Sequence, residues 1–126
     1  MATILLVEIA KDFTQMFKEA LVNEGLTVVS TRGSEEAERV FQTASPDLVL
    51  LGLSLPTFAG LDVLARLDLT TRTRKIPAIV ITNESWSKGQ VAEAHDRGAR
   101  EHTMARAYDY APLIQAIKEA LMVNQT

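Results

Sequence analysis

Residues 46–56 read PDLVLLGLSLP, and this stretch gives the clearest indication of the fold. Its centre is apolar at every position, which is typical of a strand buried on both faces of a sheet. Gly52 follows, and Ser54 and Pro56 indicate a loop. We therefore predict a central strand over Asp47–Gly52. In α/β domains a reactive side chain often follows such a strand, yet residue 52 is a glycine and has none.

Strand-like and helix-like segments alternate along the rest of the chain. Helical segments carry apolar residues three and four positions apart, as Phe13, Met16 and Phe17 do. Five alternations predict a parallel sheet with helices on both faces, in one domain over residues 1–126. The other expected strands are Thr3–Val7, Leu26–Thr31, Pro77–Thr82 and Arg100–Met104; the expected helix caps are Asp12, Ser34, Asp109 and Ser87, the last in a capping box with Gln90.

The composition is that of an ordinary folded domain. The 126 residues are 47% hydrophobic and 23% charged, the net charge is −3, and there is no cysteine. The apolar runs are too short to span a bilayer, and the first residues lack the features of a signal peptide. We therefore expect a cytoplasmic protein that binds neither membranes nor, through this domain alone, nucleic acid.

A family resemblance emerges from the ordered set of segments ILLVE, PDLVLLGLSLP, Gly60, IPAIVIT and GARE. In order and spacing they resemble the receiver domain of two-component response regulators, over the whole chain. The resemblance implies a flavodoxin-like (βα)5 three-layer sandwich, with strands in the order 2-1-3-4-5. It also implies a role in signal transduction by phosphorelay.

Receivers take a phosphoryl group onto an aspartate after the third strand. Two acids after the first strand hold Mg²⁺, a hydroxyl residue follows the fourth strand, and a Lys-Pro pair follows the fifth. Residue by residue, the resemblance assigns the aspartate position to Gly52 and the positions of the two acids to Glu8 and Ile9. It assigns the hydroxyl position to Thr82, and the positions of the Lys-Pro pair to Ala105 and Arg106. The last assignment allows a shift of one residue.

The residues at these positions do not suit phosphoryl chemistry. An acyl phosphate needs a carboxylate nucleophile, which Gly52 lacks. Mg²⁺ prefers octahedral oxygen coordination, and Glu8 with a backbone carbonyl near Ser54 supplies too few oxygens. We therefore expect a degenerate pseudo-receiver that is not an enzyme and needs no metal or cofactor. Glu8 is then expected to be a solvated carboxylate, and Thr82 to tether its own loop.

Two alternatives remain open. A phospho-switch could use Ser54 or Thr57 as a substitute acceptor, although the sequence places no base beside either hydroxyl. A flavodoxin-like domain could instead bind a small ligand. Phosphate cradles favour Gly, Ser and Thr at the start of a helix, and the loop EIAKDF after the first strand has none of them.

The resemblance also implies a protein partner, which binds the surface of the fourth helix, fifth strand and fifth helix; a second copy of the chain is one candidate. Residue types enriched at interfaces occur near these segments. The interface candidates are Trp86, Met104, Tyr108 and Tyr110. Trp86, near the start of the fourth helix, could join the others in one patch. His102 falls where receivers carry an aromatic switch residue, and is either such a wedge or a plain edge-strand residue.

Overall fold

The computed structural model describes residues 1–67, 69, 75–104 and 109–123. Its sheet has five parallel strands in the order β2-β1-β3-β4-β5, which confirms the flavodoxin-like topology predicted from the sequence. The predicted strands agree with the observed ones to within one residue at each end. The strands are β1 (Thr3–Val7), β2 (Thr27–Thr31), β3 (Leu48–Leu51), β4 (Ala78–Thr82) and β5 (Ala99–Thr103).

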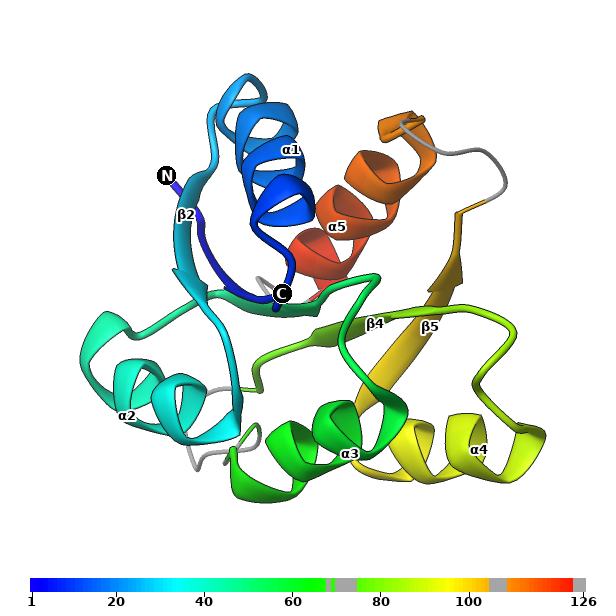
Figure 1. Ribbon diagram of the computed structural model, residues 1–126. Helices are drawn as coiled ribbons and strands as arrows, with labels where there is room; N and C mark the ends of the chain where they lie inside the picture. Colours follow the sequence, from blue (N-terminus) through cyan, green and yellow to red (C-terminus); the bar gives the residue numbers. More distant parts are fainter. Residues whose placement is uncertain (68, 70–74, 105–108, 124–126) are drawn as a thin grey trace.

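Helices cover both faces of the sheet and complete the three layers. Helices α1 and α5 lie on one face, and α2, α3 and α4 on the other (Figure 1). None of the helices in the described part of the chain is long and apolar enough to cross a membrane. The helices are α1 (Lys11–Val22), α2 (Ser34–Ala44), α3 (Thr57–Arg66), α4 (Lys88–Asp96) and α5 (Ala111–Val123).

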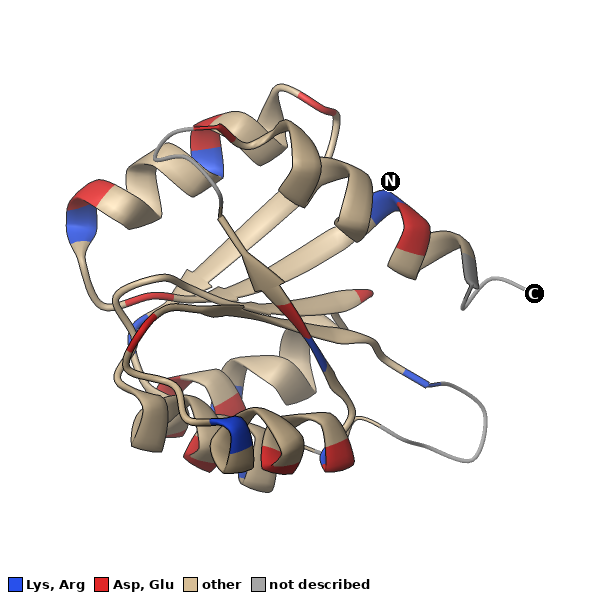
Figure 2. Ribbon diagram, turned by 90° about the vertical axis from the view of Figure 1, so that its right-hand side faces the viewer, with Lys and Arg blue, Asp and Glu red and all other residues tan. Residues whose placement is uncertain are grey.

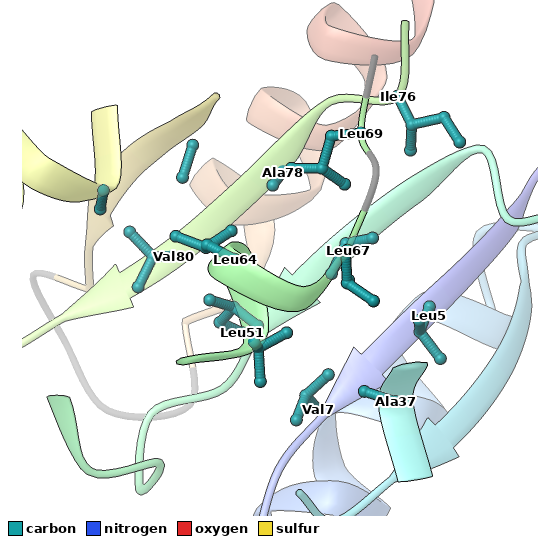
Figure 3. Close-up of a cluster of buried hydrophobic side chains, with 14 of the residues drawn as sticks. Leu5, Val7, Ala37, Leu51, Leu64, Leu67, Leu69, Ile76, Ala78 and Val80 are labelled. Atoms are coloured by element: carbon teal, nitrogen blue, oxygen red, sulfur yellow. The ribbon is translucent and has the colours of Figure 1, made fainter. Parts of the chain in front are cut away.

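Strand β3 is buried along its whole length, as its apolar sequence predicted. Its side chains alternate between two cores. Val49 and Leu51 face the core under α2, α3 and α4, part of which Figure 3 shows around Leu51. Leu48 and Leu50 face the core under α1 and α5. Because each buried leucine contributes about 1.5–3 kcal/mol, a strand that supplies both cores fixes the centre of the fold.

The N-cap residues of the helices can be compared with the predicted caps. Helix α4 has the expected capping box, in which the Ser87 hydroxyl accepts from the Gln90 N–H at 3.1 Å. The predictions for Asp12 and Ser34 were wrong, because α1 is capped by Ala10 and α2 by Gly33. Helix α1 has no side-chain cap, and the Glu8 carboxylate accepts the N–H of the cap residue Ala10 at 2.9 Å.

The parallel arrangement places the carboxyl ends of all strands at one edge of the sheet. Glu8 after β1, Gly52 after β3 and Thr82 at the end of β4 therefore lie at this edge.

Candidate functional site

Glu8, the residue after β1, is the centre of a closed hydrogen-bonded cluster. Its exposed fraction is 0%. Oε1 accepts the Ser54 N–H at 3.1 Å, and Oε2 accepts both the Ala10 N–H at 2.9 Å and the Ser54 hydroxyl. All three partners are donors, which suits a carboxylate because it only accepts. The expectation of a solvated Glu8 was wrong: these donors replace water and allow the charge to be buried.

Gly52 makes this burial possible. Its N–H donates to the Val7 carbonyl at 2.8 Å, so β1 and β3 stay paired up to this residue. A Cβ atom on residue 52 would overlap Oε1 of Glu8 and lie only 2.9 Å from its Cβ and Cδ. Turning the Glu8 side chain would not move its Cβ. The missing side chain of Gly52 thus leaves the space that Glu8 occupies.

The neighbouring acid position is held by Ile9, whose side chain is 39% exposed. Ile9 offers only its backbone oxygen, which accepts from the Arg32 guanidinium at 3.2 Å. Within the described ranges there is no group of three or more His, Cys, Asp or Glu residues that could hold a metal ion. The hydrogen-bond partners described for the Glu8 carboxylate are all N–H or O–H donors.

The two candidate substitute acceptors differ. Ser54 is exposed and donates its hydroxyl hydrogen to Glu8, so the expectation that no base lies beside it was wrong. The sequence could not reveal this contact, because the two residues are 46 positions apart. The hydroxyl of Thr57 lies 3.4 Å from that of Ser85, with no carboxylate in this contact.

At the end of β4, Thr82 is 6% exposed and its hydroxyl lies 3.0 Å from that of Thr103. Thr82 therefore binds the neighbouring strand, and the prediction that it tethers its own loop was wrong. Asn83 holds the loop instead: Oδ1 accepts the Ser85 N–H at 2.8 Å, and Nδ2 donates to the Leu53 carbonyl at 3.3 Å. The bonds made by Asn83 and Thr103 were not predicted from the sequence, although an Asx-type turn residue directly after a strand was an available signal for the first.

His102 does not meet Thr82. In the register of β4 and β5, His102 pairs with Ile81 and Thr103 pairs with Thr82, so the two predicted switch side chains lie on opposite faces of the sheet. His102 is half-buried. Loss of hydration through this burial lowers the pKa of its imidazole below the ordinary value.

The interface candidates pack against different cores. Trp86 packs against the core under α2, α3 and α4. Met104 and Tyr110 pack against the core under α1 and α5, where Tyr110 meets Phe17 edge-to-face at 5.5 Å between ring centroids. Trp86 therefore does not join their patch, although the sequence suggested that it could. The predictions for Ala105, Arg106 and Tyr108 fall outside the described residues.

Comparison with known proteins supplies the class. The family model of the response regulator receiver domain matches residues 4–118. The chain therefore belongs to the response regulator receiver domain family, as the sequence resemblance predicted. Receiver domains are signalling modules of two-component systems.

The relatives agree with this assignment. Polar-differentiation response regulator DivK of Brucella ovis is 29% identical over 119 residues, which cover 94% of this chain and 95% of DivK. Transcriptional regulatory protein YcbL of Bacillus subtilis, itself described as uncharacterized, is 30% identical over 93% of this chain. The chain spans only 50% of the length of YcbL.

Solved structures show the same fold. Chemotaxis response regulator CheY4 of Vibrio cholerae superimposes with a TM-score of 0.78 at 20% identity, over 95% of this chain and 98% of that chain. A chain in the crystal structure of histidine kinase ThkA in complex with response regulator TrrA gives a TM-score of 0.73 at 22% identity. That match covers 96% of this chain and 99% of the other.

Proposed function

We propose that this receiver domain works without phosphorylation and signals by binding another protein. The observation that carries the proposal is the position of Glu8. Its carboxylate lies where the side chain of residue 52 would otherwise begin, and the family resemblance assigns the phosphoacceptor to residue 52. The domain thus carries a carboxyl group in its pocket, supplied from the end of β1 instead of β3.

Glu8 itself is a poor substitute acceptor. An acceptor must present a free oxygen to the phosphoryl donor, but the Glu8 side chain is fully buried and both its oxygens accept hydrogen bonds. Freeing either oxygen would break hydrogen bonds to part-buried N–H groups, at a cost of roughly 0.5–1.5 kcal/mol for each.

The direct test is incubation with acetyl phosphate and Mg²⁺, followed by intact-mass measurement. We expect no gain of about 80 Da, the mass of one phosphoryl group. The Gly52→Asp variant should also remain unmodified, because Glu8 occupies the space that its carboxylate needs. Stoichiometric phosphorylation of the wild-type chain would contradict the proposal.

One observation favours the second candidate, a phospho-switch that uses Ser54. Ser54 is an exposed residue whose hydroxyl is bonded to a carboxylate, the arrangement that activates a serine nucleophile. Ser54→Ala and treatment with hydroxylamine separate the cases if a phosphoryl group is gained. Hydroxylamine cleaves an acyl phosphate and spares phosphoserine, so a gain that resists it and disappears in Ser54→Ala would establish this alternative.

The proposed partner surface is the face formed by α4, β5 and α5. Support comes from the edge strand β5, where Arg100, Glu101 and Thr103 are all exposed. Charges of both signs are distributed over the helices and loops in Figure 2, so this face would select a partner by local charge pattern. The TrrA structure, with its histidine kinase bound, gives a precedent in the same fold for recognition of a protein.

Capture of partners from native extract tests this surface. Reversing both charges, with Arg100→Glu and Glu101→Arg, should weaken capture at least tenfold, about 1.4 kcal/mol. Arg39→Glu, at an exposed position on α2, is the matched control and should leave capture unchanged. Tyr110 is unsuitable as a probe because it packs against Phe17. Equal capture by both variants would exclude this face, and sedimentation of the purified chain would reveal a self-association that the same variants should weaken.

A further inference from the structure

A cavity of about 450 Å³ opens at the carboxyl ends of β4 and β5, beside the Glu8 cluster. Its wall is mostly apolar. It is formed by Phe13 and Phe17 of α1, Leu53 after β3, Met104 after β5, and Tyr110 before α5. We propose that this cavity binds a small, uncharged, aromatic molecule.

Size and shape support an aromatic ligand. Pockets for small molecules commonly measure 300–1,000 Å³ and are lined by apolar and aromatic side chains. Here Phe17 contacts Phe13 at 6.5 Å and Tyr110 at 5.5 Å between ring centroids, the second pair edge-to-face. A ligand ring that enters the cavity would extend this series of ring contacts, which stabilise beyond the burial of apolar area.

The polar side of the cavity disfavours an anion. It is lined by Thr82, Asn83, Glu84 and Thr103. Glu84 carries an exposed carboxylate, and among the described lining residues there is no Lys, Arg or His to offset it. A phosphate or carboxylate ligand would meet this charge without a counter-ion.

The remaining polar groups also have partners. The hydroxyls of Thr82 and Thr103 lie within hydrogen-bond distance of each other. The Asn83 amide is bonded to Ser85 in its own loop and to the Leu53 carbonyl after β3. Few hydrogen bonds are therefore left for a ligand, and most of the binding free energy would come from apolar burial. This chemistry differs from that of flavin or nucleotide sites, which need a phosphate cradle.

The test uses N-phenyl-1-naphthylamine, an uncharged dye whose fluorescence rises in apolar surroundings. We expect saturable binding of one dye to each chain. Its sulfonated analogue, 8-anilino-1-naphthalenesulfonate, should bind at least tenfold more weakly because of Glu84. Absence of saturable binding, or stronger binding of the sulfonate, would overturn the proposal.

Three variants locate the site. Leu53→Trp should fill the cavity and weaken binding of the neutral dye at least tenfold. Glu84→Lys, at an exposed position, should strengthen binding of the sulfonate at least fivefold while binding of the neutral dye changes little. Phe58→Ala removes an aromatic ring that is 76% exposed outside the cavity and should change neither. Loss of dye binding in Phe58→Ala, or no response to Glu84→Lys, would place the dye elsewhere and refute the site.

Discussion

The two halves of the same sheet edge have opposite character. Where β1 and β3 end, Glu8 fills the space beside Gly52 and its oxygens are bonded to protein donors. Where β4 and β5 end, a cavity of about 450 Å³ remains. This edge of the sheet is thus divided into two halves. We call the end of β1 and β3 the filled half, and the end of β4 and β5 the open half.

The difference arises from which side chains meet at each half. At β1 and β3, a long acid lies opposite a residue with no side chain, and their volumes complement each other. At β4 and β5, two threonine hydroxyls pair with each other, and short side chains leave space beneath the aromatic wall. In the first half the Glu8 carboxylate is bonded to protein donors, whereas the second half leaves space beside the aromatic wall.

The largest effect is expected from Gly52→Ala. The added Cβ would lie 2.9 Å from the Cβ and Cδ of Glu8, so β1 and β3 would have to separate. We expect a loss of about 3 kcal/mol in the free energy of unfolding, measured by urea denaturation. In a Glu8→Gly background the same change should cost less than about 1 kcal/mol, because the overlapping atoms are gone.

Gly89→Ala is the matched control. Residue 89 is in α4, and the nearest atom to an added Cβ there is the Ser87 hydroxyl oxygen at 4.0 Å. Alanine should stabilise the helix by about 0.5–1 kcal/mol. If Gly52→Ala behaves like this control, the filled half is not packed as described.

The second prediction concerns the bonds of Glu8. Glu8→Ala should lower the free energy of unfolding by about 2 kcal/mol, because the Ala10 and Ser54 N–H groups lose their acceptor. Glu8→Gln should cost about half as much. The amide oxygen of the glutamine can still accept a hydrogen bond, but its NH₂ group cannot accept from the donor that the second carboxylate oxygen serves. Equal stability of all three proteins would show that Glu8 is solvated after all.

The third prediction concerns the hydroxyl pair at the ends of β4 and β5. Thr82→Val should lower the free energy of unfolding by about 1 kcal/mol, because it removes the hydroxyl that pairs with Thr103. Adding Thr103→Val should recover most of this loss, since replacing both partners leaves no unmatched hydroxyl. A double-mutant cycle measures the coupling, and strictly additive effects would show that the hydroxyls do not interact.

The fold could be predicted from the sequence because the patterns that indicate each strand and helix are local. Continuous apolar strands such as β3 indicate burial on both faces, and their alternation with amphipathic helices indicates the parallel sheet. The helix starts were less readable. Helix α1 begins after Ala10, which has no side chain able to cap it, so the usual cap preferences do not indicate this position.

The site was only partly readable because its contacts join distant segments. An acid after a strand normally indicates a solvated side chain, and only the pairing of β1 with β3 brings Gly52 beside Glu8. The contact between Thr82 and Thr103 depends on the register of β4 and β5. Parallel strands have no connecting hairpin turn to fix that register, so the sequence alone does not give it.

The smallest predicted effect is the pH dependence due to His102, near the open half. Burial lowers the pKa of its imidazole in the folded state, so the unfolded chain binds the proton more readily. Stability should therefore fall as the pH is lowered from about 6.5, the ordinary pKa value, through the folded pKa. At higher pH this group should not affect stability.

His102→Gln should remove that part of the acid sensitivity and raise the thermal midpoint at the acidic end by about 1–2 °C relative to wild type. The effect is small because a half-buried group is partly screened by solvent. The other histidine, His95, is exposed, and His95→Gln serves as the control that should follow the wild-type profile. Identical profiles for both variants would show that His102 is hydrated like a surface residue, which would mean that water reaches the α1–α5 side of β5 more freely than its packing indicates.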